Sequence, residues 1–165
     1  MLGLAEGVSR ARPSQPTGDA ANDRYPLSVG SDTRPKPLRI LVVDDETSIL
    51  AFAEHVLTGA GYEVVVAQDG PEALRLMDAQ RPFDLFVVDV LMPQMPGDEL
   101  ARHLRHRDPD AKILYFTGFS DRLFAEHGVL WEHEAFIDKP VTMNGLLEAV
   151  SLLLLGRTKD LPPKR

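Results

Sequence analysis

The stretch DLFVVDVLMP, residues 84–93, decides the fold of this chain. Its apolar run, residues 85–88, predicts a strand buried on both faces, as in a parallel sheet covered by helices. Asp89 follows this run directly, just before an irregular loop. The carboxyl ends of strands in open α/β sheets border the crevice where ligands bind, so Asp89 is a candidate functional residue. An aspartate that merely begins a loop is the commoner alternative.

Composition indicates a globular protein of ordinary kind. Of the 165 residues, 44% are hydrophobic and 26% are charged, and this length suits one domain with some residues to spare. The absence of cysteine excludes disulfides and cysteine-ligated zinc. No apolar stretch resembles a secretory signal or approaches the length of a membrane span. We therefore expect a cytoplasmic protein without a membrane partner.

Charge is unevenly distributed along the sequence. Residues 1–37 carry a net charge of +1 and residues 156–165 a net charge of +3, which leaves −11 on residues 38–155 out of a total of −7. A strongly acidic region repels a phosphate backbone, so direct nucleic-acid binding is not expected.

Strand and helix patterns alternate along residues 38–155. Short apolar runs predict five strands, at 38–43, 62–67, 84–88, 112–116 and 135–138. Between and after them, periodic patterns predict five helices. Thr47 or Ser48 can cap the first, Pro71 suits the first turn of the second, and the fourth, at 120–127, is weak. Helices between successive strands predict a parallel, doubly wound sheet in a single α/β domain.

Two tails flank the predicted domain. Residues 1–37 are rich in Pro, Ser, Gly and Asp and lack an apolar period, so they are expected to be disordered. Residues 156–165 form a short basic tail after Gly156, which is placed to end the last helix.

Reactive side chains stand at the carboxyl ends of four predicted strands. Asp44 and Asp45 end the first, Asp89 the third, Thr117 the fourth and Lys139 the fifth. Carboxylates gathered at one sheet edge repel one another unless a cation neutralises them, and Mg²⁺ prefers such oxygen ligands. A metal, an ammonium group and a hydroxyl together suit a phosphoryl group that one carboxylate attacks.

Each of these residues alone has an ordinary explanation. An Asp-Asp pair commonly caps a helix, a terminal Thr commonly belongs to a turn, and a Lys before Pro is usually just exposed. Their joint occurrence at the right strand ends, in order, favours the functional interpretation.

Residues 38–155 resemble the receiver domain of two-component response regulators. The matching motifs are VVDDE at 42–46, VDVLMP at 88–93 with Pro96-Gly97, FTG at 116–118 and DKP at 138–140. The resemblance implies a flavodoxin-like fold with strand order 2-1-3-4-5.

The resemblance also implies a role for each site residue. Asp89 would accept a phosphoryl group from a histidine kinase or a histidine phosphotransfer protein. Asp45, Asp89 and the Leu91 carbonyl would bind Mg²⁺ directly, and Asp44 would act through water. Thr117 and Lys139 would bind the phosphoryl oxygens, and the Lys139–Pro140 bond would be cis.

Two further hypotheses concern the switch and the lifetime of the phosphoryl group. Phe136 occupies the position of the aromatic switch residue that moves with Thr117, although it lacks a hydroxyl; a plain core phenylalanine is the alternative. Leu91 and Phe119 are bulky apolar neighbours of the site, which would hinder the attacking water and slow dephosphorylation.

Apolar residues of the fourth and fifth helices exceed what one buried face requires. They suggest a partner or homodimer face at the fourth helix, fifth strand and fifth helix, against the alternative of simple core packing. The candidate interface residues are Leu123, Phe124, Leu152 and Leu155. The five histidines fall on helices or their flanks, where no zinc site is expected.

The sequence thus predicts a stand-alone receiver that acts through phosphorylation-dependent contact with a downstream protein and is not a turnover enzyme. A Mg²⁺-dependent phosphohydrolase is a second class, disfavoured because no acid/base carboxylate stands two residues after Asp89. A pseudo-receiver that binds partners without phosphorylation is a third, disfavoured by the intact acidic, Thr and Lys positions.

Overall fold

The five predicted strands form one parallel sheet in the computed structural model, which describes residues 36–80, 82–118 and 130–156. The sheet order is β2-β1-β3-β4-β5, so the predicted doubly wound, flavodoxin-like fold is confirmed. The strands are β1 (Arg39–Val43), β2 (Glu63–Ala67), β3 (Leu85–Val88), β4 (Ile113–Thr117) and β5 (Glu134–Asp138).

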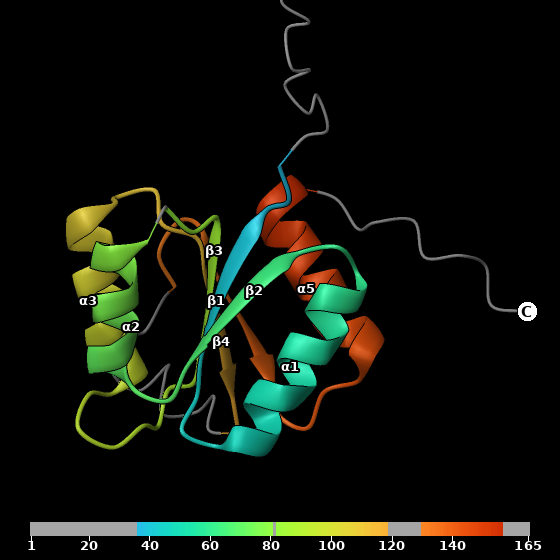
Figure 1. The fold of residues 1–165 in the computed structure, drawn as a ribbon, viewed down its shortest axis with the longest axis horizontal. Coiled ribbons are helices and arrows are strands. Elements are labelled where there is room, and N and C mark those ends of the chain that lie inside the picture. Colours follow the sequence, from blue (N-terminus) through green and yellow to red (C-terminus); the bar gives the residue numbers. More distant parts are fainter. Residues whose placement is uncertain (1–35, 81, 119–129, 157–165) are drawn as a thin grey trace, which may run out of the picture. The chain divides into compact units, whose positions relative to one another are not determined.

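Helices cover both faces of this sheet. α1 (Thr47–Gly59) and α5 (Met143–Leu155) lie on one face, and α2 (Gly70–Ala79) and α3 (Gly97–Arg107) lie on the other (Figure 1). The helix expected at 120–127 lies outside the described residues. Among the residues that the structure does describe, no helix has the length and apolar character needed to cross a membrane.

Two of the helix ends agree with the prediction from the sequence, and one differs from it. Pro71 lies in the first turn of α2 and Gly156 ends α5 with a φ of 65°, both as predicted, and Asp69 caps α2 by accepting a hydrogen bond from the Glu72 N–H at 2.7 Å. The prediction that Thr47 or Ser48 caps α1 is wrong, because the cap position is Glu46 and its side chain makes no cap bond. Instead, the Asp44 carboxylate accepts from the Glu46 N–H at 2.9 Å, so a candidate site residue also shapes the start of α1.

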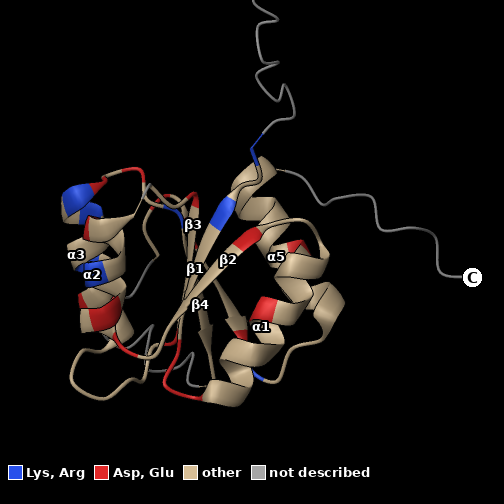
Figure 2. Cartoon of the chain, viewed as in Figure 1, with Lys and Arg blue, Asp and Glu red and all other residues tan. Residues whose placement is uncertain are grey.

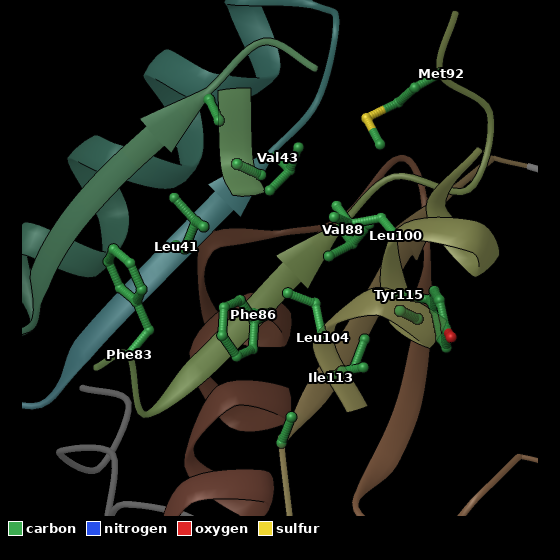
Figure 3. Packing of buried hydrophobic residues seen from close by; sticks show 14 of the residues in the cluster. Leu41, Val43, Phe83, Phe86, Val88, Met92, Leu100, Leu104, Ile113 and Tyr115 are labelled. Carbon is green, nitrogen blue, oxygen red and sulfur yellow. The ribbon is translucent and has the colours of Figure 1, made fainter. Parts of the chain in front are cut away.

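Alternate side chains of the buried strands belong to two apolar clusters, one on each face of the sheet. Leu41 and Phe86 point to the α2 and α3 face, where they pack with Leu104 and Tyr115 (Figure 3). Their sequence neighbours point to the α1 and α5 face. Every residue of β1, β3 and β4 is buried, which explains why these strands read as continuous apolar runs.

Arg39 is a buried charge at the start of β1, with only 5% of its surface exposed. Its Nε lies 2.7 Å from Glu63 of β2, and its guanidinium donates to Gln80 at 2.7 Å and stacks 4.4 Å from the Phe83 ring centre. Its backbone N–H donates to Asp84 at 2.7 Å. These contacts fix the amino end of the sheet, away from the candidate site.

Gly97 lets α3 begin directly against the loop that carries Asp89. A Cβ at position 97 would lie 2.1 Å from the Asp89 carbonyl oxygen, which is backbone and cannot move aside cheaply. The Gly97 N–H also donates to the Val90 carbonyl at 2.9 Å. Glycine is therefore required here by close backbone approach.

We expect Gly97→Ala to lower the free energy of unfolding by about 2 kcal/mol or more, because the added methyl group must displace backbone. Gly59→Ala is the matched control, since a Cβ there meets nothing within 4 Å, and helical Ala is favoured over Gly by roughly 0.5–1 kcal/mol. Urea unfolding of both variants measures the difference. Equal stability of the two variants would contradict the close approach.

Candidate functional site

The carboxyl ends of β1, β3, β4 and β5 bring the predicted site residues to one edge of the sheet. Asp44 and Asp89 each directly follow a buried strand. The Asp89 N–H donates to the Val43 carbonyl at 2.9 Å, and the Lys139 N–H donates to the Thr117 carbonyl at 2.9 Å. Backbone bonds between neighbouring strands therefore set the positions of these residues.

Three carboxylates converge at this edge. Asp44, Asp45 and Asp89 each offer an oxygen, and these oxygens all lie within 4.8 Å of one another. Asp44 is 1% exposed and Asp89 6% exposed, whereas Asp45 lies at the surface. Such proximity is electrostatically costly without a counter-charge.

Lys139 supplies that counter-charge from β5. Its Nζ lies 2.6 Å from Asp44 Oδ2, 3.5 Å from Asp89 Oδ1 and 3.7 Å from Glu46 Oε1. The same Nζ sits 5.3 Å from the centre of the Phe116 ring, which adds cation–π stabilisation. The lysine thus bridges the end of β1 to the end of β3.

The pKa values show that this compensation is incomplete. Burial is the main reason that the pKa of Asp89 rises to about 6, and the Asp44 charge adds to it, while Lys139 acts in the opposite direction. Burial also raises the pKa of Asp44, against the hydrogen bond from Lys139. For Lys139, burial alone would lower the pKa, but the hydrogen bond to Asp44 and the nearby carboxylates outweigh it and raise the pKa.

An open pocket lies over these side chains. Its walls are polar on most sides, and the half-buried Leu91 adds an apolar part. The residues that line it are Asp45, Glu46, Asp89, Leu91, Gly118 and Lys139. A small group that enters this pocket meets both a carboxylate and an ammonium group.

The donor set fits a hard divalent cation. Carboxylate oxygens so close together suit Mg²⁺, which takes one or two carboxylates and keeps several waters. The open pocket leaves room for those waters and for a further oxygen ligand. The residues present are therefore compatible with the predicted magnesium site.

The two predicted switch residues occupy different environments. Thr117 is fully buried, whereas Phe136 is 39% exposed. Phe136 pairs in register with Tyr115, which precedes Thr117 by two residues on the same face of β4. The alternative that Phe136 is a plain core phenylalanine is therefore wrong.

The remaining predicted positions are only partly described. The Lys139–Pro140 peptide bond is cis. Leu152 and Leu155 of the suggested interface are 52% and 41% exposed. Phe119, Leu123 and Phe124 lie outside the described residues. The four described histidines are exposed, and none joins a group of potential metal ligands within the described ranges; they are His55, His103, His106 and His133.

Sequence reasoning assigned no role to Glu46 or Gly118, although both lie in quoted motifs. Glu46 lines the pocket and approaches Lys139, and Gly118 lines the opposite side after Thr117. Their places directly after strand-end residues were the available signal. Gly97 also lies in a quoted motif, but the reason for a glycine there, a close backbone approach, is shown only by the coordinates.

A parallel doubly wound sheet with clustered aspartates and a lysine at its carboxyl edge defines the class of receiver-type signalling domains. The family model for the response regulator receiver domain matches residues 40–151. The chain belongs to the response regulator receiver family.

Solved structures support the same conclusion. Response regulator TrrA from Thermotoga maritima, solved in complex with Mg²⁺-BeF, matches with a TM-score of 0.63 and 35% identity over 71% of this chain and 99% of that chain. Chemotaxis protein CheY4 of Vibrio cholerae matches with a TM-score of 0.63 and 31% identity over 72% of this chain and 99% of that one.

Curated relatives differ in how much of their length is matched. Response regulator MprA of Mycolicibacterium vanbaalenii is 37% identical over 75% of this chain but only 53% of its own length. Response regulator receiver protein CpdR of Brucella abortus is 31% identical over 72% of this chain and 98% of its own length. The chain thus spans about half the length of the first relatives it matches, and the prediction of a stand-alone receiver stays a prediction.

We expect Asp89→Asn to raise the free energy of unfolding at pH 7 by about 1–3 kcal/mol when divalent ions are chelated. The folded protein holds the Asp89 proton up to about pH 6, against a reference pKa of 3.8. Ionisation of Asp89 therefore lowers the free energy of unfolding as pH rises from about 4 to 6, and the full cost is present above pH 6. The gain in stability from Asn should accordingly shrink toward about pH 4. Urea unfolding at both pH values measures it.

Asp110→Asn is the control for this measurement, since Asp110 is an exposed carboxylate away from the site. Added Mg²⁺ should raise the melting temperature of the native sequence more than that of Asp89→Asn, because only the former has the full set of carboxylates to neutralise. A destabilised Asp89→Asn at pH 7 would contradict the electrostatic account.

Proposed function

We propose that this protein is the phosphoacceptor of a two-component or phosphorelay system, phosphorylated on Asp89 in a Mg²⁺-dependent reaction. The donor would be a histidine kinase or a histidine phosphotransfer protein, and output would follow from phosphorylation-dependent contact with a downstream protein. The single observation that carries this proposal is the placement of Lys139 within 2.6 Å of Asp44 and 3.5 Å of Asp89 at the floor of an open pocket.

The chemistry follows from the charges at this edge. A carboxylate oxygen of Asp89 attacks phosphorus, a new O–P bond forms, and the N–P bond to the donor imidazole breaks with its electron pair going to nitrogen. Lys139 binds a phosphoryl oxygen and offsets its charge, and Thr117 offers a hydroxyl to another. When bound at the aspartates, Mg²⁺ supplies further positive charge for the phosphoryl oxygens.

The pKa of Asp89 does not prevent this role. Although burial raises it to about 6, the carboxyl is still mostly ionised at neutral pH, and a bound cation favours the ionised form. A carboxylate with a raised pKa is also a better nucleophile than one held far below its usual range. Asp89 is thus both available and reactive.

The alternatives are less well supported. A pseudo-receiver has no need for buried, mutually repelling carboxylates, which cost stability unless a charged ligand is bound. A phosphohydrolase would need an acid/base group near the scissile bond, but the position two residues after Asp89 is Leu91. Both alternatives nevertheless predict outcomes that the following experiment separates.

Incubation with acetyl phosphate and Mg²⁺ should add one phosphoryl group to the intact protein and none to Asp89→Asn, as measured by mass spectrometry. Asp110→Asn is the control and should be phosphorylated normally. Phosphorylation of neither the native protein nor the control would favour the pseudo-receiver, and equal phosphorylation of Asp89→Asn would refute Asp89 as the acceptor. Sustained phosphate release from added phosphate monoesters would favour the hydrolase.

The apolar wall at Leu91 should lengthen the lifetime of the phosphoryl group. Leu91 lines the pocket beside Asp89, where a polar side chain could orient an attacking water. We expect the Leu91→Asn, Phe119→Ala double variant to dephosphorylate about tenfold faster, measured by the loss of radiolabelled phosphate in Mg²⁺ after the phosphodonor is removed. An unchanged rate would contradict this.

A further inference from the structure

The outer face of α3 carries positive charge on an otherwise acidic domain. Four exposed residues form this basic stripe, namely Arg102, His103, His106 and Arg107. Residues 38–155 have a net charge of −11, so a local excess of basic residues stands out. Figure 2 shows basic residues at the last turn of α3, at the opposite end of the helix from its acidic first turn.

The arginines of the basic stripe form only long ion pairs with acidic groups of the chain itself. Arg102 lies 3.4 Å from Asp98, and Arg107 lies 3.3 Å from Asp78. The Arg107 and Asp78 side chains are 38% and 63% exposed, whereas Arg102 is 64% exposed and its partner Asp98 only 11% exposed. The exposed pair of Arg107 and Asp78 contributes little to stability, so an incoming carboxylate can replace it at small cost.

An exposed tryptophan lies against α3, the helix that carries the basic stripe. Trp131 is 63% exposed and is the only tryptophan of the chain. Its ring stacks with the Arg105 guanidinium at 5.5 Å, and its backbone N–H donates to Glu134 at 3.0 Å. These contacts hold a large apolar ring at the surface.

The support beneath Trp131 is buried and rigid. Arg105 pairs with Glu134, and their side chains are only 17% and 3% exposed. Glu134 also accepts a hydrogen bond from the Tyr115 hydroxyl at 3.1 Å. Because the guanidinium and the ring are already ordered, a partner that binds them loses little conformational freedom.

From this surface we infer that the basic stripe and Trp131 bind an acidic segment of a partner protein that also carries an apolar side chain. The carboxylates would pair with Arg102 and Arg107, and the apolar side chain would pack on the Trp131 ring. Trp and Arg are the residue types that most often dominate binding energy at protein interfaces. A nucleic acid fits less well, because its extended phosphate backbone would meet the surrounding acidic surface.

This inference is independent of phosphorylation. The basic stripe belongs to α3 and Trp131 precedes β5 at its amino end, whereas Asp89 and Lys139 stand at the carboxyl ends of their strands. Arg102 also lines a pocket with Asp45 and Leu91, but the pairing of charges and the packing on Trp131 need no phosphoryl group. Failure of Asp89 to accept a phosphoryl group would therefore leave the inference intact.

The test uses the full chain and a fluorescein-labelled peptide in which glutamates flank a Leu-Phe pair. Fluorescence polarisation should show binding that a matched peptide with lysines in place of the glutamates lacks. Arg102→Glu with Arg107→Glu should weaken binding at least about tenfold and reduce its salt dependence. Trp131→Ala should weaken binding about fivefold or more while leaving the salt dependence unchanged.

The matched control reverses two exposed charges elsewhere, Lys36→Glu with Arg75→Glu, and should retain near-native affinity. If the control reversals weaken binding as much as the α3 reversals do, binding reflects net charge alone and the inference is overturned. Tighter binding of a labelled single-stranded oligonucleotide through the same residues would also overturn it. Light scattering provides a further test. If the native chain self-associates and the α3 reversals abolish this, the surface binds a second copy of the chain and the inference is overturned.

Discussion

The packing of three aspartates against one lysine is the constraint on which this structure depends. Asp44 and Asp89 are buried at the ends of adjacent strands, and their mutual repulsion is only partly offset by Lys139, which reaches across from β5. A fold that keeps such a cluster must draw its stability from elsewhere. The fully buried strands β1, β3 and β4, with an apolar cluster on each face, provide it.

The same constraint explains why the site residues sit where they do. Each charged group directly follows a strand whose backbone bonds to its neighbours, so the carboxylates cannot move apart to relieve their repulsion. The Asp44 side chain also fixes the start of α1 through the Glu46 N–H. Gly97 permits α3 to close over the other side. An incoming cation or phosphoryl group therefore meets ligands that are already in place.

The sequence predicted the sheet and the site because both depend on local patterns. Buried strands give continuous apolar runs, and residues that directly follow such strands in a parallel sheet must share one edge. What the sequence could not predict depends on contacts between distant segments. The sequence assigned no role to Arg39 within the first strand, yet the side chain is buried against Glu63, Gln80 and Phe83. The cap of α1 was misassigned because Thr47 and Ser48 have the right chemistry, whereas the helix begins after Glu46, whose N–H is bound by the Asp44 carboxylate.

The two ends of the domain carry opposite charges for different physical reasons. At the carboxyl end of the sheet, the acidic cluster is buried and its geometry is fixed, so it suits a small, highly charged group. On the outer face of α3, Arg102 and Arg107 are exposed, and Trp131 stacks on the neighbouring Arg105, so this surface suits an extended and partly apolar partner. Tyr115 reaches from the strand that carries Thr117 to Glu134 beneath Trp131. Strand β4 therefore contributes a residue to each of the two surfaces, Thr117 at its carboxyl end and Tyr115 beneath the tryptophan.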